Sequence, residues 1–135
     1  MYGNPTFNCD GADIRAHCRQ LATVVKVSGH LDSANVERAG RYIDRFILPE
    51  KAFVLDLSDV DSFTQEAISL LFVIDDLCTA AGDEWSLIAS RAVEQTLSDA
   101  GIEFPAAGSV PEALNHFADA MVARRQLLPL LTKTA

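Results

Sequence analysis

The apolar positions of this chain change period along its length, and each change marks the boundary of a predicted element. Residues 13–19 alternate between polar and apolar, with Cys18 among the apolar positions, and this alternation predicts a half-exposed strand. The segment 23–27 is rich in valine, which is typical of a more central strand. Because only a short turn at residues 20–22 separates the two segments, we expect them to form a hairpin.

Helical spacing begins after this hairpin. Apolar residues recur at intervals of three and four and predict a helix, with Asp32 or Ser33 as its N-cap; they are Val36, Ala39, Ile43 and Phe46. The apolar run 53–57 then predicts a strand. The nearly continuous apolar stretch that follows predicts a helix over 65–81 that is apolar all round and buried, ending before Gly82.

The remainder of the chain continues the alternation of strands and helices. A short apolar strand is expected at 85–89 and a helix at 91–100. Ser109, followed three residues later by Glu112, is typical of a capping box and begins a last helix with an apolar stripe over 113–122. Strands that alternate with helices favour an α/β domain with crossover connections.

Size and charge limit the classes of partner. The 135 residues are enough for one domain with its own core. A net charge of −8 argues against nucleic acid or an anionic membrane surface, because both are negative, and favours a protein partner. The three cysteines are unpaired in spacing, no signal peptide is evident, and the longest apolar run, 68–74, is too short to span a membrane. We therefore expect a cytoplasmic protein without membrane insertion.

No pattern of residues indicates an enzyme, a cofactor or a metal. His17, His30 and His116 are scattered without the spacing of zinc ligands, and the glycines form no phosphate-binding cluster. Asp56 ends a strand as the phosphoacceptor of a receiver domain does. The chain lacks the acidic pair and the late lysine of such a site, so a structural role is favoured for Asp56. A small phosphotransfer or hydrolytic enzyme is the less favoured alternative.

Two segments carry a resemblance to a known family. They are two predicted strands with the predicted helix between them: Val24-Val-Lys-Val-Ser-Gly-His-Leu-Asp32 and Val54-Leu-Asp-Leu-Ser-Asp-Val60. The motifs at the ends of these strands, in this order, resemble those of the STAS domain family of bacterial anti-sigma factor antagonists. The resemblance extends from about Asp13 to about Arg125. It implies an α/β, STAS-like single domain, with a mixed sheet of four to five strands and about four helices mainly on one side. We divide the chain into an N-terminal extension (1–11), the STAS-like domain (12–125) and an apolar C-terminal tail (126–135).

The chain departs from the family in the loop before the helix at 65–81. The family's Asp-Ser-Ser-Gly falls on residues 64–67, so that Glu66 occupies the position of the serine that a partner kinase phosphorylates. A carboxylate cannot be phosphorylated, and it carries one negative charge where phosphoserine carries about −1.5 to −2. Glu66 can imitate the phosphorylated state, or it can be an ordinary acid in a helix's first turn, a favourable position worth ~0.3 to 1 kcal/mol. Both interpretations can hold together, because phosphoserine and glutamate are favoured at the same helix start. Thr64 and Ser62 are the remaining phosphorylation candidates in this loop.

The resemblance implies a non-catalytic regulator that binds an anti-sigma factor or a related kinase-like protein. We predict the partner-binding residues on two loops: His30, Asp32, Ser33, Ser62, Thr64, Gln65, Glu66 and Ser69. The alternative within binding proteins is a scaffold or sensor subunit that is not paired with an anti-sigma kinase. The tail at 126–135 is expected to pack on the domain or on another chain, and a homodimer is one such arrangement.

Overall fold

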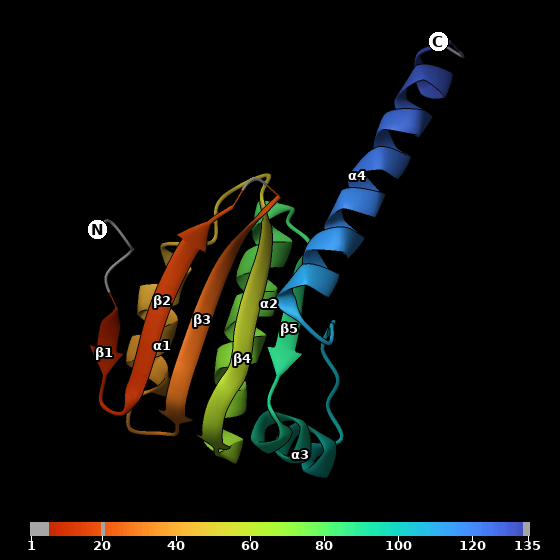
Figure 1. Ribbon diagram of the computed structural model, residues 1–135. Coiled ribbons are helices and arrows are strands. Elements are labelled where there is room, and N and C mark those ends of the chain that lie inside the picture. Colours follow the sequence, from red (N-terminus) through yellow and green to blue (C-terminus); the bar gives the residue numbers. More distant parts are fainter. Residues whose placement is uncertain (1–5, 20, 134–135) are drawn as a thin grey trace.

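Five strands form one sheet, and their order in space follows their order in the sequence. The structure is a computed structural model that describes residues 6–19 and 21–133, with side chains as far as Ala123. Its elements are β1 (Phe7–Cys9), β2 (Ala12–Cys18), β3 (Ala22–Leu31), α1 (Val36–Asp44), β4 (Ala52–Phe63), a 3₁₀ turn η1 (Gln65–Ala67), α2 (Ile68–Ala81), β5 (Trp85–Ala89), α3 (Arg91–Ala100) and α4 (Val110–Lys133) (Figure 1).

The sheet is mixed, and the connections explain why. Strands β1, β2 and β3 pair antiparallel through short turns, and the predicted hairpin of β2 and β3 is confirmed. Strands β3, β4 and β5 pair in parallel. A parallel pair requires a crossover connection, which α1 supplies between β3 and β4 and α2 supplies between β4 and β5. The predicted mixed sheet of four to five strands is therefore confirmed.

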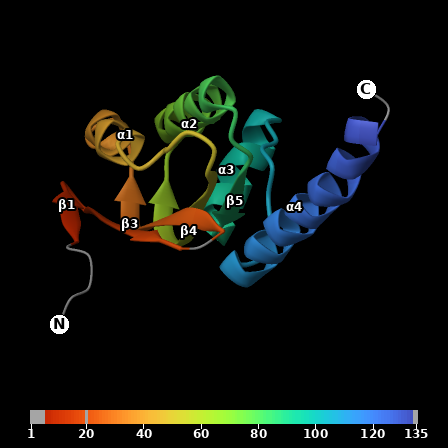
Figure 2. The same cartoon turned by 90° about the horizontal axis from the view of Figure 1, so that it is seen from above.

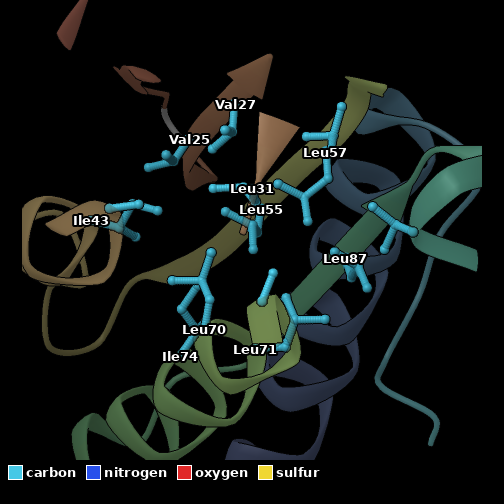
Figure 3. Close-up of a cluster of buried hydrophobic side chains, with 14 of the residues drawn as sticks. Val25, Val27, Leu31, Ile43, Leu55, Leu57, Leu70, Leu71, Ile74 and Leu87 are labelled. Carbon is cyan, nitrogen blue, oxygen red and sulfur yellow. The ribbon is translucent and has the colours of Figure 1, made fainter. Parts of the chain in front are cut away.

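Helices cover both faces of the sheet unequally. Figure 2 shows α1, α2 and α3 on one face and the first turns of α4 on the other. The larger core lies under α1 to α3, where Figure 3 shows the facing side chains of strands and helices. A smaller core joins Val24, Val54 and Ile88 of the sheet to Ala113 and Phe117 of α4. The expectation of helices mainly on one side is confirmed.

Strand β4 is longer than the predicted segment 53–57, and it ends at Phe63. The extra length comes from pairing with β3, which runs in parallel with it as far as Leu31 and Phe63, and from the burial of Val60. Ser62 consequently lies at the end of a strand, whereas the sequence placed it in a loop. The helix predicted over 65–81 begins as the 3₁₀ turn η1 and continues as α2.

The two ends of the chain add to the predicted domain. Within the segment set apart as 1–11, β1 pairs with β2 and extends the sheet. At the other end α4 continues to Lys133, beyond the predicted stripe over 113–122. Figure 1 shows the later turns of α4 leaving the sheet. The side chains of the apolar tail lie outside the described residues.

Two predictions of burial were wrong. The helix over 65–81 is not buried all round, because the side chains of Phe72 and Val73 are 48% and 46% exposed. Helix α2 belongs to an outer layer, so that only the side facing the sheet is covered (Figure 2). Cys18 is exposed as well, because it is the last residue of β2 and the alternation of the strand ends there.

Candidate functional site

The carboxyl ends of β3 and β4 bring the two predicted loops together. His30 pairs in register with Ser62, and Leu31 pairs with Phe63. The Thr64 N–H donates to the Leu31 carbonyl oxygen at 3.1 Å, which continues the contact beyond the strands. The segments 30–33 and 62–69 are therefore neighbours at one edge of the sheet, as expected from parallel strands.

The first segment forms a tight turn before α1. The Asp32 Oδ1 accepts a hydrogen bond from the Ala34 N–H at 2.9 Å, and the His30 Nε2 lies 3.8 Å from the Asp32 Oδ2. Ser33 is exposed beside them. The prediction that Asp32 or Ser33 caps α1 was wrong, because Asn35 is the N-cap residue, and its side chain makes no capping hydrogen bond. The Asp32 backbone carbonyl instead accepts the N–H of Val36 at 3.0 Å.

Asn35 organises this end of the site, and the sequence analysis missed it. Its side chain is fully buried. The Nδ2 group lies within donor distance of the carbonyl oxygens of Cys9, Asp10 and His30, at 3.1, 3.2 and 2.9 Å. The Oδ1 accepts from the Asp32 N–H at 3.0 Å. An asparagine directly before a helical apolar pattern was the only available signal, since its partners lie up to 26 residues away in sequence.

A pair of glycines lets the β1–β2 turn approach the end of β3. Gly29 has a φ of +96°, and a Cβ there would lie 2.2 Å from the carbonyl oxygen of Gly11. That same oxygen accepts the His30 N–H at 3.0 Å. A side chain at position 29 would therefore break this contact and misplace His30, which gives a physical reason for the glycine before His30.

In the second segment, residues 62–69, several polar side chains are exposed to solvent and one hydroxyl is buried. Ser62, Gln65 and Glu66 are exposed, and the Ser69 hydroxyl donates to the Glu66 carbonyl oxygen at 2.9 Å. The Oγ1 of Thr64 is buried and has no hydrogen-bond partner within the described part of the chain. Of the two candidate hydroxyls, only that of Ser62 is on the surface.

The side chains considered as candidates for catalysis or metal binding are either hydrogen-bonded within the fold or unreactive. The buried Asp56 accepts two hydrogen bonds from Ser58 at its Oδ1, from the N–H at 3.0 Å and from the hydroxyl at 2.6 Å, so this oxygen orders the strand. Burial raises the pKa of the Cys78 thiol to about 12, so that the thiolate is scarce at neutral pH. Over residues 6–19 and 21–123, no three His, Cys, Asp or Glu side chains are grouped as metal ligands. None of the described helices is long and apolar enough to cross a membrane.

Known proteins resemble this chain in sequence and in fold. Osmosensory protein A from Mycobacterium tuberculosis is 45% identical over an alignment of 140 positions that covers 98% of this chain and 89% of that protein. An anti-sigma factor antagonist from Mycobacterium paratuberculosis has a TM-score of 0.70 at 21% identity, over 81% of this chain and 96% of that one. An RsbS variant from Moorella thermoacetica, with glutamate in place of a serine, has a TM-score of 0.67 at 20% identity, over 82% and 97%.

The fold agrees with these comparisons. The anti-sigma factor antagonist SpoIIAA in its unphosphorylated form has a TM-score of 0.66 at 13% identity, over 78% of this chain and 96% of that one. The described sheet and its helices therefore have the SpoIIAA-like arrangement. The family model for the STAS domain matches residues 13–113, which include β3, β4, α2 and both segments of the site. The chain belongs to the STAS domain family.

Proposed function

We propose that this protein is a non-catalytic regulator that binds a partner protein through segments 30–33 and 62–69, in the manner of an anti-sigma factor antagonist. The observation that carries the proposal is the position of Glu66. Its exposed carboxylate stands in η1, directly before α2. The resemblance to the family assigns the phosphorylatable serine to this position. The proposed partner is an anti-sigma factor or a related kinase-like protein in the cytoplasm.

Glu66 would hold the site permanently near the phosphorylated state. A carboxylate supplies negative charge at the surface without a kinase and cannot lose it to a phosphatase. A similar fold accommodates such a change, since the RsbS structure carries glutamate in place of a serine. The protein would then be released from a partner that recognises the hydroxyl.

Any phosphorylation within this site would fall on Ser62 more readily than on Thr64. The Thr64 Oγ1 is buried, so a kinase could reach it only after the turn between β4 and η1 had opened. Ser62 is exposed at the end of β4, next to His30 of the neighbouring strand.

A binding titration of Glu66→Ser against the GHKL-type kinases of the native host tests the proposal. GHKL-type kinases share the ATPase fold of the family's partner kinases. The substitution removes one rim charge and returns a hydroxyl, so binding should tighten, mainly through faster association, and the gain should shrink as salt is raised. Glu66→Gln separates the loss of charge from the return of the hydroxyl.

Glu94→Ser is the matched control, because Glu94 is an exposed acid in the first turn of α3. It should leave kinase binding unchanged. If the wild type binds a kinase tightly and Glu66→Ser binds no better, Glu66 is an ordinary acid of the helix start and the proposed role is wrong.

A second candidate function is a sensor or scaffold subunit that never meets an anti-sigma kinase. The relative that is 45% identical is named an osmosensory protein, which favours an osmotic signal for this chain as well. Affinity purification from host cells before and after an increase in osmolarity distinguishes the two functions. A sensor subunit would exchange partners with osmolarity and would recover no GHKL-type kinase in either condition.

A further inference from the structure

Helices α1 and α2 leave a groove between them on the side that faces away from the sheet. They lie side by side on the same face of the sheet (Figure 2), and a groove of about 510 Å³ remains between them. Its apolar wall consists of Val36 and Gly40 from α1 and Leu70, Val73 and Leu77 from α2. One end opens at the proposed site, since Ser33, Glu66 and Ser69 also line it.

Gly40 leaves space in this groove because it has no side chain, although the backbone and the neighbouring atoms would tolerate a larger residue at this position. It lies inside α1 at an ordinary helical φ, and a Cβ there would meet only the Leu70 Cδ1, at 3.5 Å, an ordinary contact. Glycine is the least favourable helix-interior residue apart from proline, so alanine would stabilise α1. The sequence therefore keeps a destabilising residue at the place where a side chain would fill the groove.

The rim of the groove is acidic at both ends. Glu37 is compensated by Arg41, whose Nη1 lies 3.1 Å from the Glu37 Oε1. Asp44 and Glu66 take part in no ion pair within the described residues. Because α1 and α2 both return along the sheet from parallel strands, they run in the same direction. Gly40 lies beside Leu70, so Glu66, four residues before Leu70, is about level with Val36 of α1. Asp44 lies eight residues beyond Val36, roughly 12 Å along the groove at 1.5 Å per residue.

We propose that this groove binds an amphipathic helical segment of a partner protein, with large apolar side chains in the middle and lysine or arginine residues about two turns apart. The apolar wall, with Val73 46% exposed, would receive the apolar side chains. The uncompensated carboxylates of Glu66 and Asp44 would receive the basic ones, and the net charge of −8 would attract such a segment from a distance. This segment belongs to a partner other than the kinase that recognises a hydroxyl at position 66, so the proposal shares with the proposed function only the premise that the protein acts by binding proteins.

Photo-crosslinking in the native host tests the proposal. A photoreactive phenylalanine analogue is placed at Val73 of the full chain, and at Thr79 as a control, since Thr79 is exposed on α2 but does not line the groove. Mass spectrometry then identifies the cross-linked peptide. We expect a segment with apolar residues flanked by lysine or arginine, captured at Val73 and not at Thr79.

A synthetic peptide of the captured sequence is then titrated against the protein. Gly40→Leu fills the groove and should weaken binding by about tenfold or more. Asp44→Asn and Glu66→Gln should each weaken it by about threefold at low salt and less at high salt, as expected for rim charges. Gly40→Ala should raise the melting temperature while weakening binding less than leucine does. A melting temperature of Gly40→Leu close to that of the wild type shows that its loss of binding comes from the filled groove and not from misfolding.

Several results would overturn the proposal. They are equal capture at Val73 and Thr79, no capture at either, capture of a second copy of this chain, capture of a segment without basic residues, and binding that Gly40→Leu leaves unchanged. Failure of the proposed function is separate from these results. It appears as kinase binding that Glu66→Ser does not alter, whereas Gly40 lies outside the two segments tested there.

Discussion

The two sides of α2 carry residues of the same apolar class and have opposite surroundings. Leu71 and Ile74 face the sheet and are essentially inaccessible, whereas Phe72 and Val73, which lie between them in sequence, are about half exposed. Phe72 contacts the ring of Phe104 edge-on, at 5.2 Å between centroids, and Val73 lines the groove beside α1. The apolar residues on one side of α2 therefore stabilise the fold, whereas those on the other side leave apolar surface exposed.

The largest effect is expected on the inner side. Leu71→Ala removes a fully buried side chain from the core in Figure 3 and should lower the free energy of unfolding by ~2 to 5 kcal/mol. Chemical denaturation measures the loss, and Ile74→Ala should give a similar value. A loss below about 0.5 kcal/mol would contradict the burial of this side.

The next largest loss of stability is expected for the buried hydrogen bonds that Asn35 makes at the candidate site. Asn35→Ala leaves the carbonyl oxygens of Cys9, Asp10 and His30 without their shared donor, which should cost about 1 to 3 kcal/mol. Denaturation of Asn35→Ala is compared with that of Asn8→Ala, because the exposed Asn8 side chain donates a hydrogen bond to the Asp13 carboxylate across one hairpin. Equal losses in the two variants would show that the buried network adds no stability.

A smaller effect, of opposite sign, is expected at a half-buried carboxylate just after α2, that of Asp83. Burial raises the pKa of Asp83, whose Oδ1 accepts the Lys51 N–H at 3.0 Å and whose Oδ2 is buried without a partner in the described residues. The folded state thus binds this proton more tightly than the unfolded state does. Stability should therefore rise as the pH falls through the folded pKa, and the gain is complete below the unfolded pKa of about 3.9.

Asp83→Asn keeps an acceptor for Lys51 and removes the charge. The variant should be more stable than wild type at neutral pH, and the difference should shrink as the pH is lowered. Thermal melting at several pH values measures both. The prediction fails if the variant is less stable than the wild type by the same amount at every pH. That result would show that the ionised Asp83 carboxylate does not destabilise the folded state.

The smallest effect on stability is expected on the outer side. Val73→Ala should change the free energy of unfolding by about 0.5 kcal/mol or less, because the side chain is half exposed. The same variant should weaken binding of the captured peptide, because Val73 lines the groove. A loss of stability as large as that of Leu71→Ala would mean that this side is part of a core and not a binding surface.

Most of the fold was accessible from the pattern of the sequence, because strands and helices impose different periods on buried positions. The hairpin, the strand before α2 and the helices at 65–81 and 91–100 were all predicted near their observed places. The errors lie at Phe72, Val73 and Cys18, where an apolar residue was taken to be buried. Hydrophobicity gives the free energy gained if a neighbour covers a side chain, and it does not say whether that neighbour exists.

The candidate site was predicted only in part. The resemblance to the STAS family pointed to His30, Asp32 and the residues around Glu66, and the parallel pairing of β3 with β4 placed them together. Asn35 was missed because its partners are distant in sequence, and the burial of the Thr64 hydroxyl could not be foreseen from a loop of polar residues.

Periodicity and motif order are properties of the chain alone, and they were enough to predict the class of fold, the family and the residue at position 66. Which apolar residues remain exposed, which hydroxyl is accessible and that Gly40 leaves a groove between α1 and α2 became visible only in the folded molecule. These features depend on the packing of elements that are remote in sequence. Such packing sets burial one side chain at a time, and no local pattern encodes it.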